Sequence, residues 1–257
     1  MNYIYSLLLL FLCSFVPTVS SIEYDSKDPK QLIQKMTDKT GTYEKLLHLR
    51  DVQYKYTTTD SKTGAEEVSI ERYIFDGELS WARFIKHELH VFPDKKGEVI
   101  QGYNGKESWV TLDGQLVEDP AAIKLADFLR KTNFYWFSMM QKLLDPGIIY
   151  TYGGKKTVNG IDYDTVKIEF ESGVGDVSDT YLLYINRNTN LIDQFLFTVM
   201  NFNITEPYLM KLEYEEVNGL LLPAKRKLTK SNWNGDILED SWTHEIMTEI
   251  KFNNNFK

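Results

Sequence analysis

Cysteine is almost missing from this chain of 257 residues, because the only one is Cys13. Cys13 lies in an N-terminal segment that we expect to be removed, so the mature protein would contain no thiol. Disulfides, zinc sites with cysteine ligands, iron–sulfur clusters and catalytic thiolates are then excluded.

An excess of basic residues is also missing. The chain has 29 Lys and Arg against 37 Asp and Glu, a net charge of −8. Binding to nucleic acid or to an anionic membrane surface usually needs a basic patch, so we expect no nucleic-acid partner. With 42% apolar and 14% aromatic residues, the chain has the composition of a folded protein.

The longest apolar run is short and lies at the N-terminus. Residues 7–16 form an apolar core interrupted only at positions 13 and 14, and small residues with Val19 and Ser21 at −3 and −1 follow it. A membrane span needs about 20 residues, so this pattern predicts a signal peptide over 1–21. We therefore expect an exported, periplasmic protein whose mature part is one domain, 22–257.

Cys13 also raises the question of a lipid anchor. Leu12 precedes it, where the lipoprotein cleavage box requires a small residue. We therefore expect plain export without a lipid anchor.

Catalytic and metal motifs are missing as well. The chain has no G-x-S-x-G, Walker A or EF-hand sequence. His87 and His90 are three apart on an expected strand, so their rings would point to opposite faces. Asp162 and Asp164 share a strand face, but they directly follow a turn, where acidic residues are common. We expect no cofactor, no metal and no enzymatic activity, with a hydrolase built on either pair as a remote alternative.

Hairpins dominate the rest of the sequence. Six of the 15 glycines follow Asn or Asp, and such pairs favour the type I′ turns that join antiparallel strands. The extended segments between the turns are Val52 to Thr59, Glu67 to Phe75, Ser80 to Val91, Glu98 to Tyr103, Glu107 to Leu112, Ile148 to Val158, Ile161 to Phe170, Asp179 to Asn186, Leu191 to Phe202, Tyr208 to Val217, Leu220 to Ser231 and Ile237 to Phe252. An antiparallel sheet of this size curls, which predicts a barrel or part-barrel.

The last of these segments alternates clearly. Apolar side chains and one histidine share one face, which we expect to meet the core, while the opposite face is polar. The expected inward residues are Leu238, Trp242, His244, Ile246, Ile250 and Phe252.

Two segments have helical patterns. Asp28-Pro29 predicts a capped helix over 29–39, and Asp119-Pro120 predicts a helical insert at about 119–145 with a break near Thr132-Asn133. The second part of the insert, 134–144, is apolar almost all the way round, so it needs a concave partner. We expect it to plug or cover the inside of the curled sheet.

Several stretches resemble the LolA/LolB-like superfamily of lipoprotein-localisation factors, and more closely an uncharacterised exported branch from Gram-negative envelopes. They are Phe134-Tyr135-Trp136-Phe137, Leu143-Leu144-Asp145-Pro146-Gly147, Gly160-Ile161-Asp162-Tyr163-Asp164, Tyr181-Leu182-Leu183-Tyr184-Ile185-Asn186 and Thr189-Asn190-Leu191-Ile192-Asp193. The resemblance covers about 29–252. It implies an α+β fold, a half-open barrel of about eleven antiparallel strands with a helical lid over a hydrophobic cavity that accepts acyl chains.

These expectations lead to a functional hypothesis, a periplasmic, monomeric, non-enzymatic carrier or binder of a lipid or acylated amphiphile. It would make transient contact with the envelope membrane or its proteins. The alternative is an envelope scaffold or interaction module whose barrel is filled by its own side chains. The residues expected to line the cavity are Trp81, Trp109, Phe128, Leu129, Phe134, Trp136, Phe137, Met140, Leu143, Phe195, Phe197 and Trp242.

Overall fold

A computed structural model describes residues 28–173 and 179–257. The expected signal peptide, Cys13 and the question of a lipid anchor therefore lie outside the described residues.

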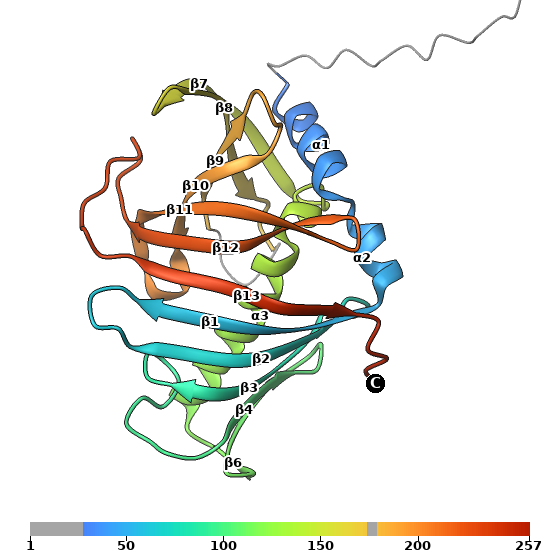
Figure 1. The fold of residues 1–257 in the computed structure, drawn as a ribbon, viewed down its shortest axis with the longest axis vertical. Coiled ribbons are helices and arrows are strands. Elements are labelled where there is room, and N and C mark those ends of the chain that lie inside the picture. The colour runs from blue at the N-terminus through green and yellow to red at the C-terminus, as the bar shows by residue number, and fades with distance from the viewer. Residues whose placement is uncertain (1–27, 174–178) are drawn as a thin grey trace, which may run out of the picture.

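Thirteen antiparallel strands form a single curled sheet in the described part of the chain, in the order β6-β5-β4-β3-β2-β1-β13-β12-β11-β10-β9-β8-β7 (Figure 1). The strands are β1 Asp51–Asp60, β2 Glu66–Ile74, β3 Leu79–His87, β4 Val99–Tyr103, β5 Ser108–Leu112, β6 Gln115–Leu116, β7 Ile148–Val158, β8 Ile161–Phe170, β9 Tyr181–Asn186, β10 Ile192–Val199, β11 Ile204–Val217, β12 Leu220–Lys230 and β13 Thr243–Phe252. The predicted fold class, an open curled antiparallel sheet with helices, is confirmed.

The first and last strands pair with each other in the middle of the sheet. β1 runs antiparallel to β13, so the meander β1–β6 and the meander β7–β13 join along this pair (Figure 1). The two edges, β6 and β7, flank the helical insert in sequence. The sheet has two strands more than the resemblance implied, and it is not closed.

Turn chemistry sets several of these pairings. Asp113-Gly114, Asn159-Gly160 and Asn218-Gly219 have positive φ at both residues, as a type I′ turn requires. They join β5 to β6, β7 to β8 and β11 to β12. The hairpin prediction is therefore confirmed at these three turns.

Within residues 28–173 and 179–257, three α-helices accompany the sheet. They are α1 Pro29–Thr40, α2 Tyr43–Leu49 and α3 Pro120–Lys142, with a short 3-10 helix, η1 Met200–Phe202. The predicted caps are confirmed, because the Asp28 carboxylate accepts from the amides of Lys30 and Gln31, and that of Asp119 accepts from the amide of Ala121. The sequence analysis missed α2.

The predicted break in the helical insert is wrong. α3 is continuous through Thr132 and Asn133. These residues are weak helix formers, but tertiary packing along the whole helix outweighs their propensity. α3 crosses the concave side of the sheet behind the central strands (Figure 1).

The concave side contains three hydrophobic clusters arranged along α3. One packs Ile33 and Met36 of α1 against the β8–β11 part of the sheet. The second packs Phe137 against β1, β2 and β12, and the third packs Ala126 against β3, β4 and β5. α3 therefore acts as the central element of the core.

The prediction for the last strand is wrong for part of its length. Glu245 and Met247 are buried, whereas His244 and Ile246 are exposed. A register shift against β1, with Glu249 at φ 57°, lies in this strand. An irregularity of this kind changes the face of the following residues, so Ile250 and Phe252 do pack inward. Leu238 precedes the strand and is 57% exposed.

Candidate functional site

A cavity of about 980 Å³ lies between α3 and the concave face of the sheet. Its size is at the upper end of the range of about 300–1,000 Å³ that small-molecule sites usually have. The lining comes from α3, from the central strands and from the β7–β12 half of the sheet.

One side of the cavity is apolar. We call the following residues the apolar wall: Leu125, Phe128, Leu129, Phe134 and Trp136 of α3 with Ile148, Phe170, Tyr181, Phe197, Val199, Tyr208 and Leu228 of the sheet. Trp136 packs edge-on against Phe197, with ring centroids 5.1 Å apart. Phe128 packs edge-on against Phe202 of η1 at 4.8 Å, and Phe202 is 48% exposed. Because Phe202 also lines the cavity, the apolar side reaches solvent at this pair.

The central strands supply a second, polar side. Thr58 on β1 is the direct cross-strand neighbour of Glu67 on β2 and of Glu245 on β13. All three line the cavity, and we call them the acidic row. Ser69, His90 and Thr243 line the cavity beside them.

A buried ion pair ends the acidic row. Arg226 on β12 is opposite Glu245, and its Nε lies 3.0 Å from Glu245 Oε2. The Arg226 guanidinium also donates to the Tyr56 hydroxyl at 2.7 Å and to the Trp136 carbonyl at 3.2 Å. Burial opposes the charge of Arg226, but the surrounding groups, Tyr56 and Glu245 first, raise its pKa. Arg226 therefore connects the sheet to the middle of α3.

A second buried ion pair involves Arg130, which precedes Trp136 on α3. Arg130 and Glu71 are both fully buried, and Nη1 lies 2.5 Å from Oε2. Arg130 Nε also donates to Gln101 Oε1 at 3.3 Å. The Ser69 and Tyr73 hydroxyls donate to the Glu71 carboxylate at 2.7 and 3.0 Å, so both of its oxygens have partners. This network fixes α3 against β2 and β4.

Five of the twelve residues predicted to line a cavity do line this one: Phe128, Leu129, Phe134, Trp136 and Phe197. Four others lie in the packed core instead. Phe137 is stacked on Tyr54 and Phe75, and Met140, Leu143 and Phe195 belong to the cluster beneath α1.

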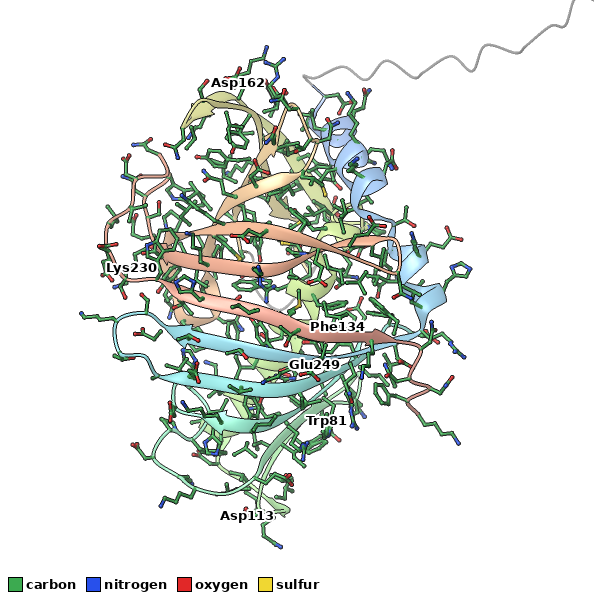
Figure 2. The ribbon with its side chains drawn as sticks, viewed as in Figure 1. Trp81, Asp113, Phe134, Asp162, Lys230 and Glu249 are labelled. Carbon is green, nitrogen blue, oxygen red and sulfur yellow. The ribbon has the colours of Figure 1, made fainter. Side chains whose placement is uncertain are left out.

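The three remaining predicted residues, all tryptophans, lie on the convex face of the sheet. Trp81 alternates with the buried Ser80 and Ala82, and its ring lies under the Arg72 guanidinium at 4.5 Å. Trp109 covers Gly102, where a Cβ would come within 2.4 Å of the indole. Trp242 lies near the ammonium groups of Lys211 and Lys227. Figure 2 labels Phe134 of α3 and Trp81 of β3.

The histidine and aspartate pairs do not form a common site. β3 ends at His87, earlier than the sequence predicts, and His87 bonds to the carbonyls of Phe92 and Gly97. His90 instead contacts Glu67. Asp162 is exposed at the β7–β8 turn at one end of the molecule, whereas Asp164 is buried and accepts from the Tyr152 hydroxyl (Figure 2).

Residues 28–173 and 179–257 contain no cluster of three or more His, Cys, Asp or Glu side chains suited to a metal ion. Within the same ranges, no helix is long and apolar enough to cross a membrane.

Sequence reasoning missed the polar residues of the site, Thr58, Glu67, Ser69 and Glu245, and it missed Arg226, the partner of Glu245. Charged residues that alternate with apolar ones on a strand normally indicate a solvated face. The one usable signal is that β2 carries acidic residues at 67 and 71 with hydroxyl residues at 69 and 73, all on one face.

Comparison with known structures finds solved proteins that share this fold. A DUF1329 family protein from Desulfovibrio piger aligns over 89% of this chain and 95% of its own, with 11% identity and a TM-score of 0.52. A candidate outer membrane lipoprotein-sorting protein domain from Vibrio parahaemolyticus aligns over 91% and 95%, with 7% identity and a TM-score of 0.51. A LolA superfamily protein from Nitrosomonas europaea aligns over 83% and 94%, with 10% identity and a TM-score of 0.47.

The fold that the resemblance implied is thus confirmed. No curated protein matches the sequence. A family model does match residues 6–228, and its description is a family of unknown function. The chain therefore belongs to that family, DUF6503.

Proposed function

We propose that this protein is a non-enzymatic carrier or binder of an acylated amphiphile, whose acyl part lies against the apolar wall beneath α3. The single observation that carries the proposal is the cavity of about 980 Å³ beside α3. A barrel filled by its own side chains, as the scaffold alternative requires, would leave no space of this size, since protein interiors are close-packed.

The character of the apolar wall supports a flexible chain as the ligand. It is built from large aromatic and branched side chains, as the walls of sites for apolar ligands are. Phe128, Leu129, Phe134, Trp136 and Phe197 are the residues that we propose contact the acyl chain. Phe202 lines the cavity and is 48% exposed, so we propose that the chain enters from solvent beside it.

The setting that we propose is the periplasm of a Gram-negative envelope, with the protein exported as a monomer and touching a membrane or membrane protein only during transfer. The shared fold with a candidate lipoprotein-sorting domain supports this setting. The signal pattern over 1–21 supports it independently.

Uptake of a fluorescent long-chain fatty acid, together with native mass spectrometry of protein purified from its own envelope, tests the proposal. Val199→Trp adds bulk inside the cavity, and Ile85→Trp adds a similar bulk on the convex face, where Ile85 is 59% exposed. We expect uptake by the wild type and by Ile85→Trp, and a clear loss with Val199→Trp. Recovery of the wild type without lipid, combined with no uptake, would overturn the proposal.

A further inference from the structure

The acidic row presents more negative than positive charge to the cavity. Glu245 has Arg226 as its partner, but the partner of Glu67 is the His90 imidazole, with Nδ1 3.4 Å from Oε2. That imidazole is 63% exposed and carries charge only when protonated. Glu67 itself is 8% exposed and also accepts from the His90 amide at 2.7 Å. Glu67 is therefore a nearly buried carboxylate without a permanent cation beside it.

The same side of the cavity has a spare hydrogen-bond acceptor. Glu67 makes both of its contacts with His90 through Oε2, and Glu67 lines the cavity, so its second carboxylate oxygen is left for a donor from within the cavity. Glu245 also lines the cavity, but its Oε2 is buried 3.0 Å from Arg226 Nε and belongs to that ion pair. Buried polar groups normally have hydrogen-bond partners, so the second oxygen of Glu67 calls for an explanation.

The basic side chains in and beside the cavity, which could otherwise bind an anionic group, already form ion pairs with acidic side chains. Of the lysines that line the cavity, Lys131 pairs with Asp127, and Lys142 pairs with Glu78 and Asp145. Arg130 and Arg226 are held by Glu71 and Glu245. A carboxylate or phosphate placed beside Glu67 would meet like charge without compensation, which is costly at a poorly hydrated site.

We infer that the acidic row is a headgroup site, which takes the ammonium group of a long-chain cationic amphiphile between Glu67, Thr58 and Glu245. An ammonium group supplies both the positive charge that Glu67 lacks and a hydrogen-bond donor for the second Glu67 oxygen. Its alkyl chain then extends along the apolar wall toward Trp136. This inference rests on the proposed function, because it assigns the head of the ligand whose chain that proposal places.

Three probes with the same alkyl chain and different heads test the inference: tetradecylammonium, tetradecanol and tetradecanoate. Each displaces the fluorescent fatty acid from the full chain at neutral pH and below its own micelle concentration. We expect tetradecylammonium to bind about tenfold more tightly than tetradecanoate, equivalent to about 1.4 kcal/mol, with tetradecanol between them.

Variants distinguish recognition of the ammonium head from binding of the alkyl chain alone. Glu67→Gln should remove most of the preference for the ammonium head, and Glu67→Asp should keep it. Glu216→Gln, at an exposed position of β11, should leave it unchanged. Thermal melting of each variant shows whether it is folded, and the comparison of probes on the wild type does not depend on any variant.

Equal binding of the three probes, or tighter binding of tetradecanoate, would overturn the headgroup site and leave the proposed carrier function intact. A preference that persists in folded Glu67→Gln would also overturn it. Absence of binding by every probe and by the fluorescent fatty acid would instead overturn the proposed function, and the headgroup site with it.

Discussion

The buried pair Arg130–Glu71 should be a main determinant of how α3 is held. Replacing Arg130 with Met removes a cation that is fully buried and leaves the Glu71 carboxyl group without its partner in the core. Burial opposes the charge of Arg130, but the Glu71 carboxylate 2.5 Å away outweighs it and raises the arginine pKa, so the guanidinium is charged at neutral pH.

The expected loss follows from the cost of an uncompensated buried charge. Removing one partner of a buried ion pair usually costs about 3–5 kcal/mol of unfolding free energy. For a chain of this size, that corresponds to a fall of about 6–20 °C in melting temperature, at roughly 2–4 °C per kcal/mol. Replacing both residues with Met should cost less than the sum of the single losses, because no charge is then left unpaired.

Urea unfolding followed by tryptophan fluorescence measures the two single variants and the double variant. Lys225→Met is the matched control, because Lys225 pairs with Glu213 at 3.9 Å on the exposed surface. An exposed pair of this kind contributes at most about 1 kcal/mol. Losses in both single variants as small as that of the control, or strictly additive losses in the double variant, would refute the reasoning.

Three further predictions concern other parts of the molecule. Phe137→Ala should cost about 3–5 kcal/mol by differential scanning calorimetry with acyl uptake retained, whereas its half-buried neighbour Trp136→Ala should reduce uptake more than stability. Asp51→Ala should lower stability by about 1–3 kcal/mol and expose the amide of Asn254 to hydrogen exchange, because the buried Asp51 carboxylate accepts from it at 2.6 Å. The hydrogen bond to Glu67 raises the pKa of His90, so its stabilising contribution is present below the unfolded value of about 6.5 and disappears as pH rises through the folded pKa. The melting temperatures of wild type and His90→Gln should therefore differ more at pH 5.5 than at pH 8, and an equal difference would contradict this.

Local chemistry made most of the fold predictable. Asn-Gly and Asp-Gly pairs need no tertiary context to favour tight hairpins, and Asp119-Pro120 marks the start of α3 for the same reason. These features are encoded within a few residues. The break expected at Thr132-Asn133 failed because the continuity of α3 depends on contacts with distant strands, which residue propensity does not contain.

The face of a strand was harder to predict than its existence. A period of two defines two faces but does not say which one is inside when the buried face carries charge. On β13, Glu245 lies inside because Arg226 on the neighbouring strand neutralises it, and the irregularity at Glu249 then changes the face of Phe252. The same alternation predicted that Trp242 faces the cavity, so the wrong prediction for Trp242 has the same cause.

The cavity exists because α3 is fixed closer to one half of the sheet than to the other. Small residues such as Ala122 and Ala126 allow the first half of α3 to approach β3, β4 and β5. Arg226 then ties the Trp136 carbonyl to the middle of the sheet, and larger side chains such as Trp136 and Phe197 bridge the wider gap beyond it. A helix held at several points keeps this space open before any ligand arrives. Binding would then require little reorganisation, which favours affinity for a flexible chain that must itself lose conformational freedom.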